Sequence, residues 1–201
     1  MLQSVSEIKT ALRSLMNGEL AVILRKRGLG YRLIFGATWP QLLALSREIE
    51  PQKELARQLW ADREVRECRL LAGLVMPAAD FSAQEADAWV SDIRFYEEAF
   101  YLTASLLGKI KQRSTKAFEW IAGSGEMRRL CGWLLLARIF NDGMRLQERS
   151  ENEFIDQADA VLRGEGGEIN KACRNAVLKY SLIGQRERLR VGKLLELIGH
   201  C

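Results

Sequence analysis

The sequence predicts an all-α fold, a curved α-solenoid of stacked helix pairs that spans residues 1–201 as a single domain. Three observations lead to this prediction. Leu, Ala, Arg and Glu dominate the composition, and only three prolines occur, so the intrinsic propensities favour helices. Helix signals recur about every 15 to 20 residues with short breaks between them. No segment shows the strict apolar and polar alternation of a half-buried strand.

Capping signals mark several of the expected helix starts. Thr38–Gln41, Ser82–Glu85 and Ser150–Glu153 each have the form of a capping box, and Pro40 fits the first turn of its helix. The expected helices cover residues 4–16, 19–27, 38–49, 51–60, 63–76, 82–90, 94–108, 114–122, 126–140, 150–162, 168–183 and 186–198. A helix pair roughly every 35 to 45 residues is the period of HEAT-like solenoids. An irregular helical bundle would fit the same periodicity.

Composition narrows the class of protein. Apolar residues make up 48% and charged residues 28%, a balance that argues against disorder. The net charge of +4 permits an anionic partner without requiring one. We expect a cytoplasmic protein without membrane contact, because neither a signal peptide nor a long apolar stretch occurs.

The residues that bind metals are few and scattered. Cys68, Cys131 and Cys173 lie in helical apolar patterns, and the sole histidine is His200, next to the end of the chain. No C-x-x-C pair occurs, so we expect no metal site and no cofactor.

Four segments carry a resemblance. They are Tyr31 to Ile49, Leu59 to Ala72 with its E-x-R-x-L-A pattern, Ala88 to Gly108, and Glu126 to Arg129. In this order they resemble the bacterial DNA alkylation repair family, which consists of alkylpurine DNA glycosylases built from HEAT-like repeats. The resemblance covers roughly residue 20 to the end. It implies that a concave basic face holds double-stranded DNA, from which the family releases N3- and N7-alkylated purines without flipping the base into a pocket.

The resemblance also implies where the chemistry would lie. In the family a tryptophan and an aspartate four residues later share one helix face, and an arginine follows in the next repeat. The aromatic ring packs against the sugar, the carboxylate stabilises positive charge on the deoxyribose, and the arginine holds phosphate. Aligning this chain with the family pattern places Tyr96 at the position of the tryptophan, Phe100 at that of the aspartate and Arg129 at that of the arginine. Arg128 is the second match for the arginine.

Phe100 can neither carry charge nor accept a conventional hydrogen bond, so the expected catalytic aspartate is absent. Glu97 lies within about 60° of Phe100 around the helix, whereas Glu98 points about 160° away. Glu97 is therefore the only nearby carboxylate that could substitute, from a displaced position. Tyr96 and Phe100 can also be interpreted as a packed aromatic pair.

Basic residues suggest where DNA would bind. The expected DNA-binding residues are Arg128, Arg129, Lys171, Arg174 and Lys179. Arg128 and Arg129 would equally fit a solvated helix face. Three functions remain open: a DNA-binding member of the family with reduced or lost excision, a protein-interaction scaffold on the same solenoid, and an active glycosylase that uses Glu97. The DNA could be alkylated, and a protein partner is a further option.

Overall fold

A computed structural model describes residues 1–164 and 166–199. Within these residues the chain forms thirteen α-helices and two short 3-10 turns, and its only bridges of β type are the isolated pairs Leu2–Ile49 and Leu33–Val65. The prediction of an all-α fold is confirmed. The chain divides into two compact units, Met1–Ser82 (unit 1) and Ala83–Cys201 (unit 2), which are described separately below.

Unit 1 is built around one helix that is almost completely buried. Its elements are α1 (Val5–Ser14), α2 (Gly18–Lys26), α3 (Trp39–Ser46), α4 (Lys53–Ala61), α5 (Arg66–Val75) and the 3-10 turn η1 (Ala78–Asp80). Helices α3 and α4 pack against α5, and α1 packs against α4. All residues of α5 except Leu74 are buried. As expected from the capping box, the Gln41 side chain accepts a hydrogen bond from the backbone N–H of Thr38, at 2.8 Å.

Two charged residues of α5 hold unit 1 together. Glu67 is fully buried and accepts the backbone N–H groups of Phe35 and Gly36, at 3.0 and 2.9 Å. The Arg69 guanidinium stacks 3.5 Å above the Trp60 ring and donates to the Trp60 carbonyl at 2.6 Å. Both side chains therefore bind partners within unit 1 and have structural roles there.

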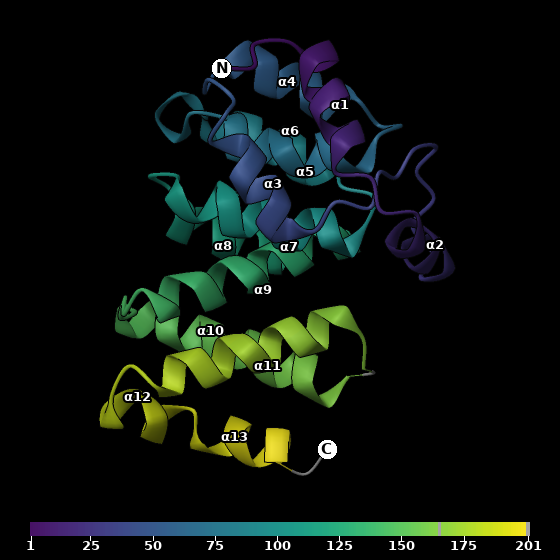
Figure 1. Ribbon diagram of the computed structural model, residues 1–201. Helices are drawn as coiled ribbons and strands as arrows, with labels where there is room; N and C mark the ends of the chain where they lie inside the picture. Colours follow the sequence, from purple (N-terminus) through teal and green to yellow (C-terminus); the bar gives the residue numbers. More distant parts are fainter. Residues whose placement is uncertain (165, 200–201) are drawn as a thin grey trace. The chain divides into compact units, whose positions relative to one another are not determined.

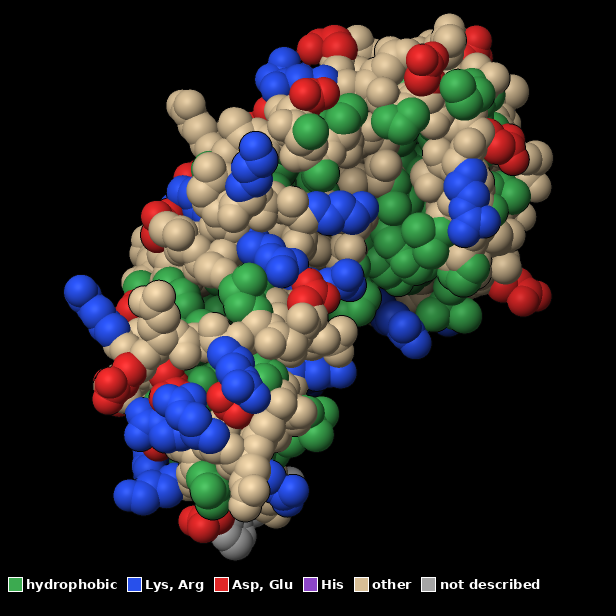
Figure 2. Space-filling model, turned by 90° about the vertical axis from the view of Figure 1, so that its left-hand side faces the viewer, with side chains coloured by type: hydrophobic (Ala, Val, Ile, Leu, Met, Phe, Trp, Pro, Cys, Tyr) green, Lys and Arg blue, Asp and Glu red, His purple; other side chains and the backbone are tan. Residues whose placement is uncertain are grey.

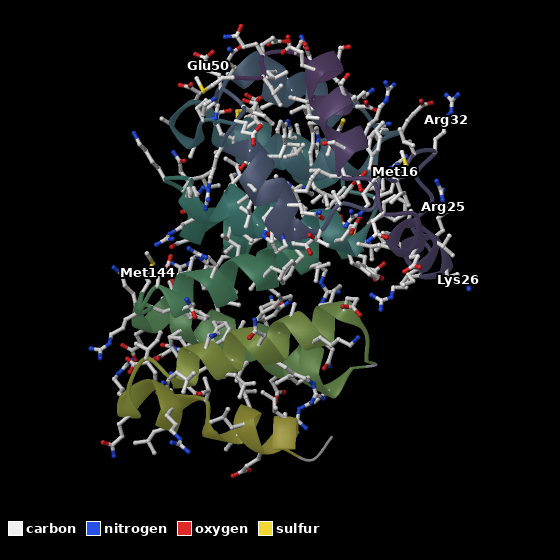
Figure 3. All side chains as sticks on the ribbon, in the orientation of Figure 1. Met16, Arg25, Lys26, Arg32, Glu50 and Met144 are labelled. Carbon is white, nitrogen blue, oxygen red and sulfur yellow. The ribbon has the colours of Figure 1, made fainter. Side chains whose placement is uncertain are left out.

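Helix α2 differs from its neighbours because none of its residues is fully buried. Val22 and Ile23 are about half exposed on its surface. Arg25, near its end, donates to the backbone carbonyl of Arg32, and Figure 3 shows both arginines on the same side of unit 1.

Unit 2 consists of helix pairs stacked on one another (Figure 1). Its elements are α6 (Ala83–Ser91), α7 (Tyr96–Ser105), the 3-10 turn η2 (Leu107–Lys109), α8 (Arg113–Ala122), α9 (Glu126–Asn141), α10 (Glu148–Arg163), α11 (Glu168–Ser181), α12 (Gln185–Arg190) and α13 (Gly192–Gly199). Helix α9 is central, since α7, α8 and α11 all pack against it. Helix α10 packs against α11 and α13.

A glycine sets the distance between α8 and α9. A Cβ atom at Gly132 would lie 2.8 Å from the backbone nitrogen of Ile121 and 2.9 Å from the carbonyl oxygen of Ala117. Both contacts are backbone atoms of α8, so neither can rotate away. Gly132 therefore marks the side of α9 that faces α8.

Expected helix ends differ from the structure by up to three residues, and two cases are instructive. Ser150 does not cap a helix, because α10 begins two residues earlier with Gln147 at its N-cap. The early start places Glu151 inside the helix, where it is fully buried and accepts a hydrogen bond from the Tyr180 hydroxyl. The expected final helix is two helices, because the backbone leaves helical geometry at Val191.

Three cysteines lie on buried helix faces, as their apolar sequence patterns predicted. Cys68, Cys131 and Cys173 are free and buried. Burial raises the pKa of both Cys68 and Cys173 to about 12, so these thiols stay protonated and unreactive at neutral pH. Cys201 and His200 lie outside the described residues.

Candidate functional site

Three helices of unit 2 surround a pocket of about 190 Å³. Phe100 comes from α7, Leu134, Arg138 and Asn141 come from α9, and Asn175 and Lys179 come from α11. Small or buried residues of α7 and α9 complete the wall. Phe100 is the aromatic member, and 55% of its surface is exposed.

The charged side chains that line this pocket are both cations. Arg138 is half exposed and makes a long ion pair of 3.4 Å with Asp142. The aliphatic part of the Arg138 side chain packs against Gly108. A Cβ atom added at Gly108 would lie 3.1 Å from the Arg138 Cγ. Lys179 is half-buried and forms no ion pair within the described residues. No carboxylate lines the described wall, so the pocket attracts anions.

The pocket continues into a second hollow of about 420 Å³. Asn141 and Lys179 line both, and Arg145 adds a further cation to the second. Arg138 of α9, Lys179 of α11 and Arg145 in the loop after α9 therefore form a basic strip beside Phe100, in which Arg145 is also paired with Glu187 at 3.4 Å.

Tyr96 lies one turn before Phe100 and pairs with an acid that the sequence analysis did not single out. Its hydroxyl donates to Glu126 Oε1 of α9 at 2.6 Å. This hydrogen bond raises the pKa of Tyr96 above its ordinary value. Tyr96 and Phe100 are 42% and 55% exposed, so they are not a buried aromatic pair, and the Phe100 ring instead meets Tyr101 edge-on at 5.3 Å.

The two glutamates next to the aspartate position lie apart from the pocket. Glu98 is buried and accepts the backbone N–H of Arg94 at 2.8 Å. Glu97 is half-buried and is not part of the pocket wall. Phe100 thus has no carboxylate beside it in the pocket.

Arg128 and Arg129 lie on a different side of α9 from the pocket. At 100° per residue they stand about 120° and 140° away from Leu134, which lines the pocket. Both flank the side marked by Gly132, which contacts α8. Their predicted role in DNA binding stays a prediction, but the structure does not bring them together with Phe100.

Arg128 has a structural partner. Asp87 of α6 accepts hydrogen bonds from Lys116 at 2.7 Å, Trp120 at 2.8 Å and Arg128 at 3.1 Å. Burial alone would raise the pKa of Asp87, but these three donors outweigh it and the pKa lies below its ordinary value. Asp87 therefore links α6, α8 and α9 as an ionised carboxylate.

Of the three lysine and arginine candidates on α11, only Lys179 lines the pocket. Lys171 pairs with Glu168 at 2.7 Å. Arg174 donates to the Asn170 side chain at 2.6 Å. Both remain predicted DNA contacts, although their nearest partners lie within the chain.

The arginines at the C-terminal end of unit 2 are held by acids. On the side of the molecule drawn in Figure 2, basic and acidic side chains are interspersed at the lower end. Arg186 and Arg190 bind the buried carboxylate of Glu151, at 3.0 and 2.9 Å. Burial would raise the pKa of Glu151, but hydrogen bonds from Tyr180 and the two arginines lower it overall.

Arg138, Asn141 and Asn175 are site residues that the sequence analysis missed. The signal that could have found Arg138 is its spacing of four residues from Leu134, which places both on one face. That face could be recognised only after Gly132 had fixed the opposite side of α9.

Neither a metal site nor a membrane-spanning helix is found in the part of the chain that the structure describes. No group of three or more histidine, cysteine, aspartate or glutamate side chains could hold a metal ion there. No helix in these residues is long and apolar enough to cross a membrane.

The described residues thus form an all-α fold, and unit 2 is a stack of helix pairs with a basic pocket. A family model described as DNA alkylation repair enzyme matches residues 8–188, so the chain belongs to the DNA alkylation repair enzyme family. No curated protein matches the sequence.

A solved structure supports the fold. It is described as "A new family of proteins related to the HEAT-like repeat DNA glycosylases with affinity for branched DNA structures". The TM-score is 0.79 at 17% identity, and the match covers 96% of this chain and 81% of the other. This similarity shows that the chain has a HEAT-like repeat fold.

Proposed function

We propose that the protein binds DNA through the basic strip beside Phe100, favours branched over linear duplex DNA, and does not excise bases. The observation that carries the proposal is the composition of the pocket beside Phe100: its charged lining residues are Arg138 and Lys179. Cations on a groove attract the phosphate backbone of DNA. Affinity for branched DNA is described for the protein family of similar fold.

The loss of excision follows from the same position. Hydrolysis of a glycosidic bond develops positive charge on the sugar, which a nearby carboxylate stabilises. Phe100 stands where the family pattern has an aspartate, and cations rather than acids surround it. A positive pocket would raise the energy of that transition state.

Binding is tested by fluorescence anisotropy with a labelled linear duplex, a fork and a four-way junction of equal length. We expect affinity for all three at low salt, tightest for the branched forms, and a steep loss as salt rises. Folded protein that binds none of them at low salt would disprove the proposal.

Excision is tested separately with duplex DNA that contains 7-methylguanine or 3-methyladenine. We expect no base release by the wild-type protein. Should release occur, Glu97→Gln and Glu126→Gln identify the carboxylate, and Glu98→Gln serves as the control because that side chain is buried. Release that depends on Glu97 would establish the displaced-acid glycosylase instead.

A scaffold for a protein partner is the second candidate, and one apolar surface favours it. Leu182 and Leu189 are 78% and 75% exposed, and both line a hollow of about 730 Å³ at α12. Exposed apolar patches often mark protein interfaces. Because Leu189 lines neither the pocket beside Phe100 nor the second hollow, Leu189→Ser is the test: if it leaves DNA affinity unchanged but removes a binding partner, the scaffold role exists beside DNA binding.

A further inference from the structure

We propose that the pocket beside Phe100 binds a single unpaired nucleobase, which a branched DNA presents where its strands separate; this inference rests on the proposed DNA-binding function. Linear duplex DNA keeps its bases stacked and paired, so it would use the basic strip without filling the pocket. The unpaired base would then account for a preference for branches.

Phe100 supplies the surface for stacking. An aromatic side chain on a protein surface normally loses solvent contact by packing, yet 55% of Phe100 remains exposed at the pocket wall. Aromatic rings bind unstacked bases through their faces, and this interaction tolerates any base. Leu134 adds apolar surface to the same wall.

Two free amides give the pocket hydrogen-bonding groups. The side chains of Asn141 and Asn175 line it and form no hydrogen bond within the described residues. An amide offers both a donor and an acceptor, which match the edge of a nucleobase. They come from α9 and α11, so they approach the pocket from two helices.

The cations are placed for the phosphates of the same nucleotide. Arg138 and Lys179 line the pocket itself, and Arg145 lies in the adjoining hollow that shares Asn141 and Lys179. The adjoining hollow gives the strand a basic path away from the pocket. A volume of about 190 Å³ is below the roughly 300–1,000 Å³ of pockets for drug-sized ligands, which favours one ring system over a base pair.

The experiment compares two three-way junctions that differ in one group. The first carries one unpaired adenine at the branch point, and the second carries an abasic tetrahydrofuran residue at that position. Their affinities are measured by anisotropy with wild-type protein, Phe100→Ala and Phe100→Trp. Leu178→Ala is the matched control, because Leu178 is 44% exposed on α11 and does not line the pocket.

For the wild-type protein and for Leu178→Ala we expect the adenine junction to bind about 10- to 100-fold more tightly than the abasic one. Phe100→Ala should abolish that difference between the two junctions, and Phe100→Trp should retain it. Phe100 is largely exposed, so circular dichroism should show that each variant is folded.

The remaining outcomes separate the two proposals. Tight binding to both junctions without a preference for adenine, or an equal loss on both with Phe100→Ala, overturns the nucleobase pocket and leaves DNA binding intact. If the folded protein binds neither junction nor duplex, the proposed function itself fails.

Discussion

Removing the two pocket cations should change how DNA binding depends on salt. In Arg138→Gln combined with Lys179→Gln, the pocket loses both of its charged lining residues. The fold should tolerate the change because Arg138 is half exposed, and its partner Asp142 keeps a shorter ion pair with Arg113 at 2.6 Å. No carboxylate is left buried without a partner.

The size of the effect follows from counterion release. Each phosphate that a cation neutralises contributes about 0.9 to the slope of log affinity against log salt. The slope of the double variant should therefore be smaller than that of the wild-type protein by about 1.8. Between about 50 and about 200 mM salt, wild-type affinity should therefore fall about 12-fold more than that of the variant. Anisotropy titrations of a labelled duplex at several salt concentrations measure both slopes.

A control variant with the same net charge separates the effect of the pocket cations from a general effect of charge. Arg163→Gln with Lys193→Gln neutralises two exposed cations that do not line the pocket. Its slope should stay close to that of the wild-type protein. Equal slopes for wild type, pocket variant and control would refute the assignment of the DNA-binding surface.

Three further predictions concern stability and ionisation. Glu151→Gln should lower the free energy of unfolding by about 1–3 kcal/mol at neutral pH, measured by urea denaturation, because it removes the charge that buried hydrogen bonds stabilise. In the folded protein the pKa of Glu151 lies below its ordinary value of 4.5. Its contribution to the free energy of unfolding is therefore present above pH 4.5 and is lost as pH falls through the folded pKa. A difference in that free energy between wild type and variant that persists unchanged at pH 3 would contradict this. Gly132→Ala should cost about 1–3 kcal/mol because its Cβ meets backbone atoms of α8, whereas Gly192→Ala, with open space around it, should be neutral or slightly stabilising in the same assay. Glu126→Gln should lower the pKa of Tyr96 in an ultraviolet titration, with the tyrosine signal assigned by Tyr96→Phe, and an unchanged pKa would show that the hydrogen bond does not form in solution.

Local signals in the sequence located most helix ends correctly. The capping box expected at Thr38 forms at the start of α3, where the Gln41 side chain accepts the backbone N–H of Thr38. Such contacts involve residues three apart, so the local sequence specifies them. The expected cap at Ser150 failed because burial of Glu151 against Tyr180, 29 residues away, decided where α10 begins.

The candidate site was only partly predictable, and α9 shows why. Its buried residues occupy nearly all sides, because α7, α8 and α11 pack around it. A helix that is apolar all round has no single stripe that indicates its orientation. The motif therefore pointed to Arg129, while the pocket face, fixed by tertiary packing, carries Arg138. Phe100, which the family pattern indicated through a spacing of four residues within one helix, does line the pocket.

The carboxylate of Asp87 has a consequence for how DNA-binding mutants are interpreted. Because it joins Lys116, Trp120 and Arg128, a substitution of Arg128 loosens the attachment of α6 to α9. Such a variant could lose DNA affinity through a shifted helix while touching no phosphate. Loss of binding by Arg128→Ala would therefore identify a DNA contact only if Asp87→Asn, which disturbs the same junction of helices without removing a cation, binds DNA normally.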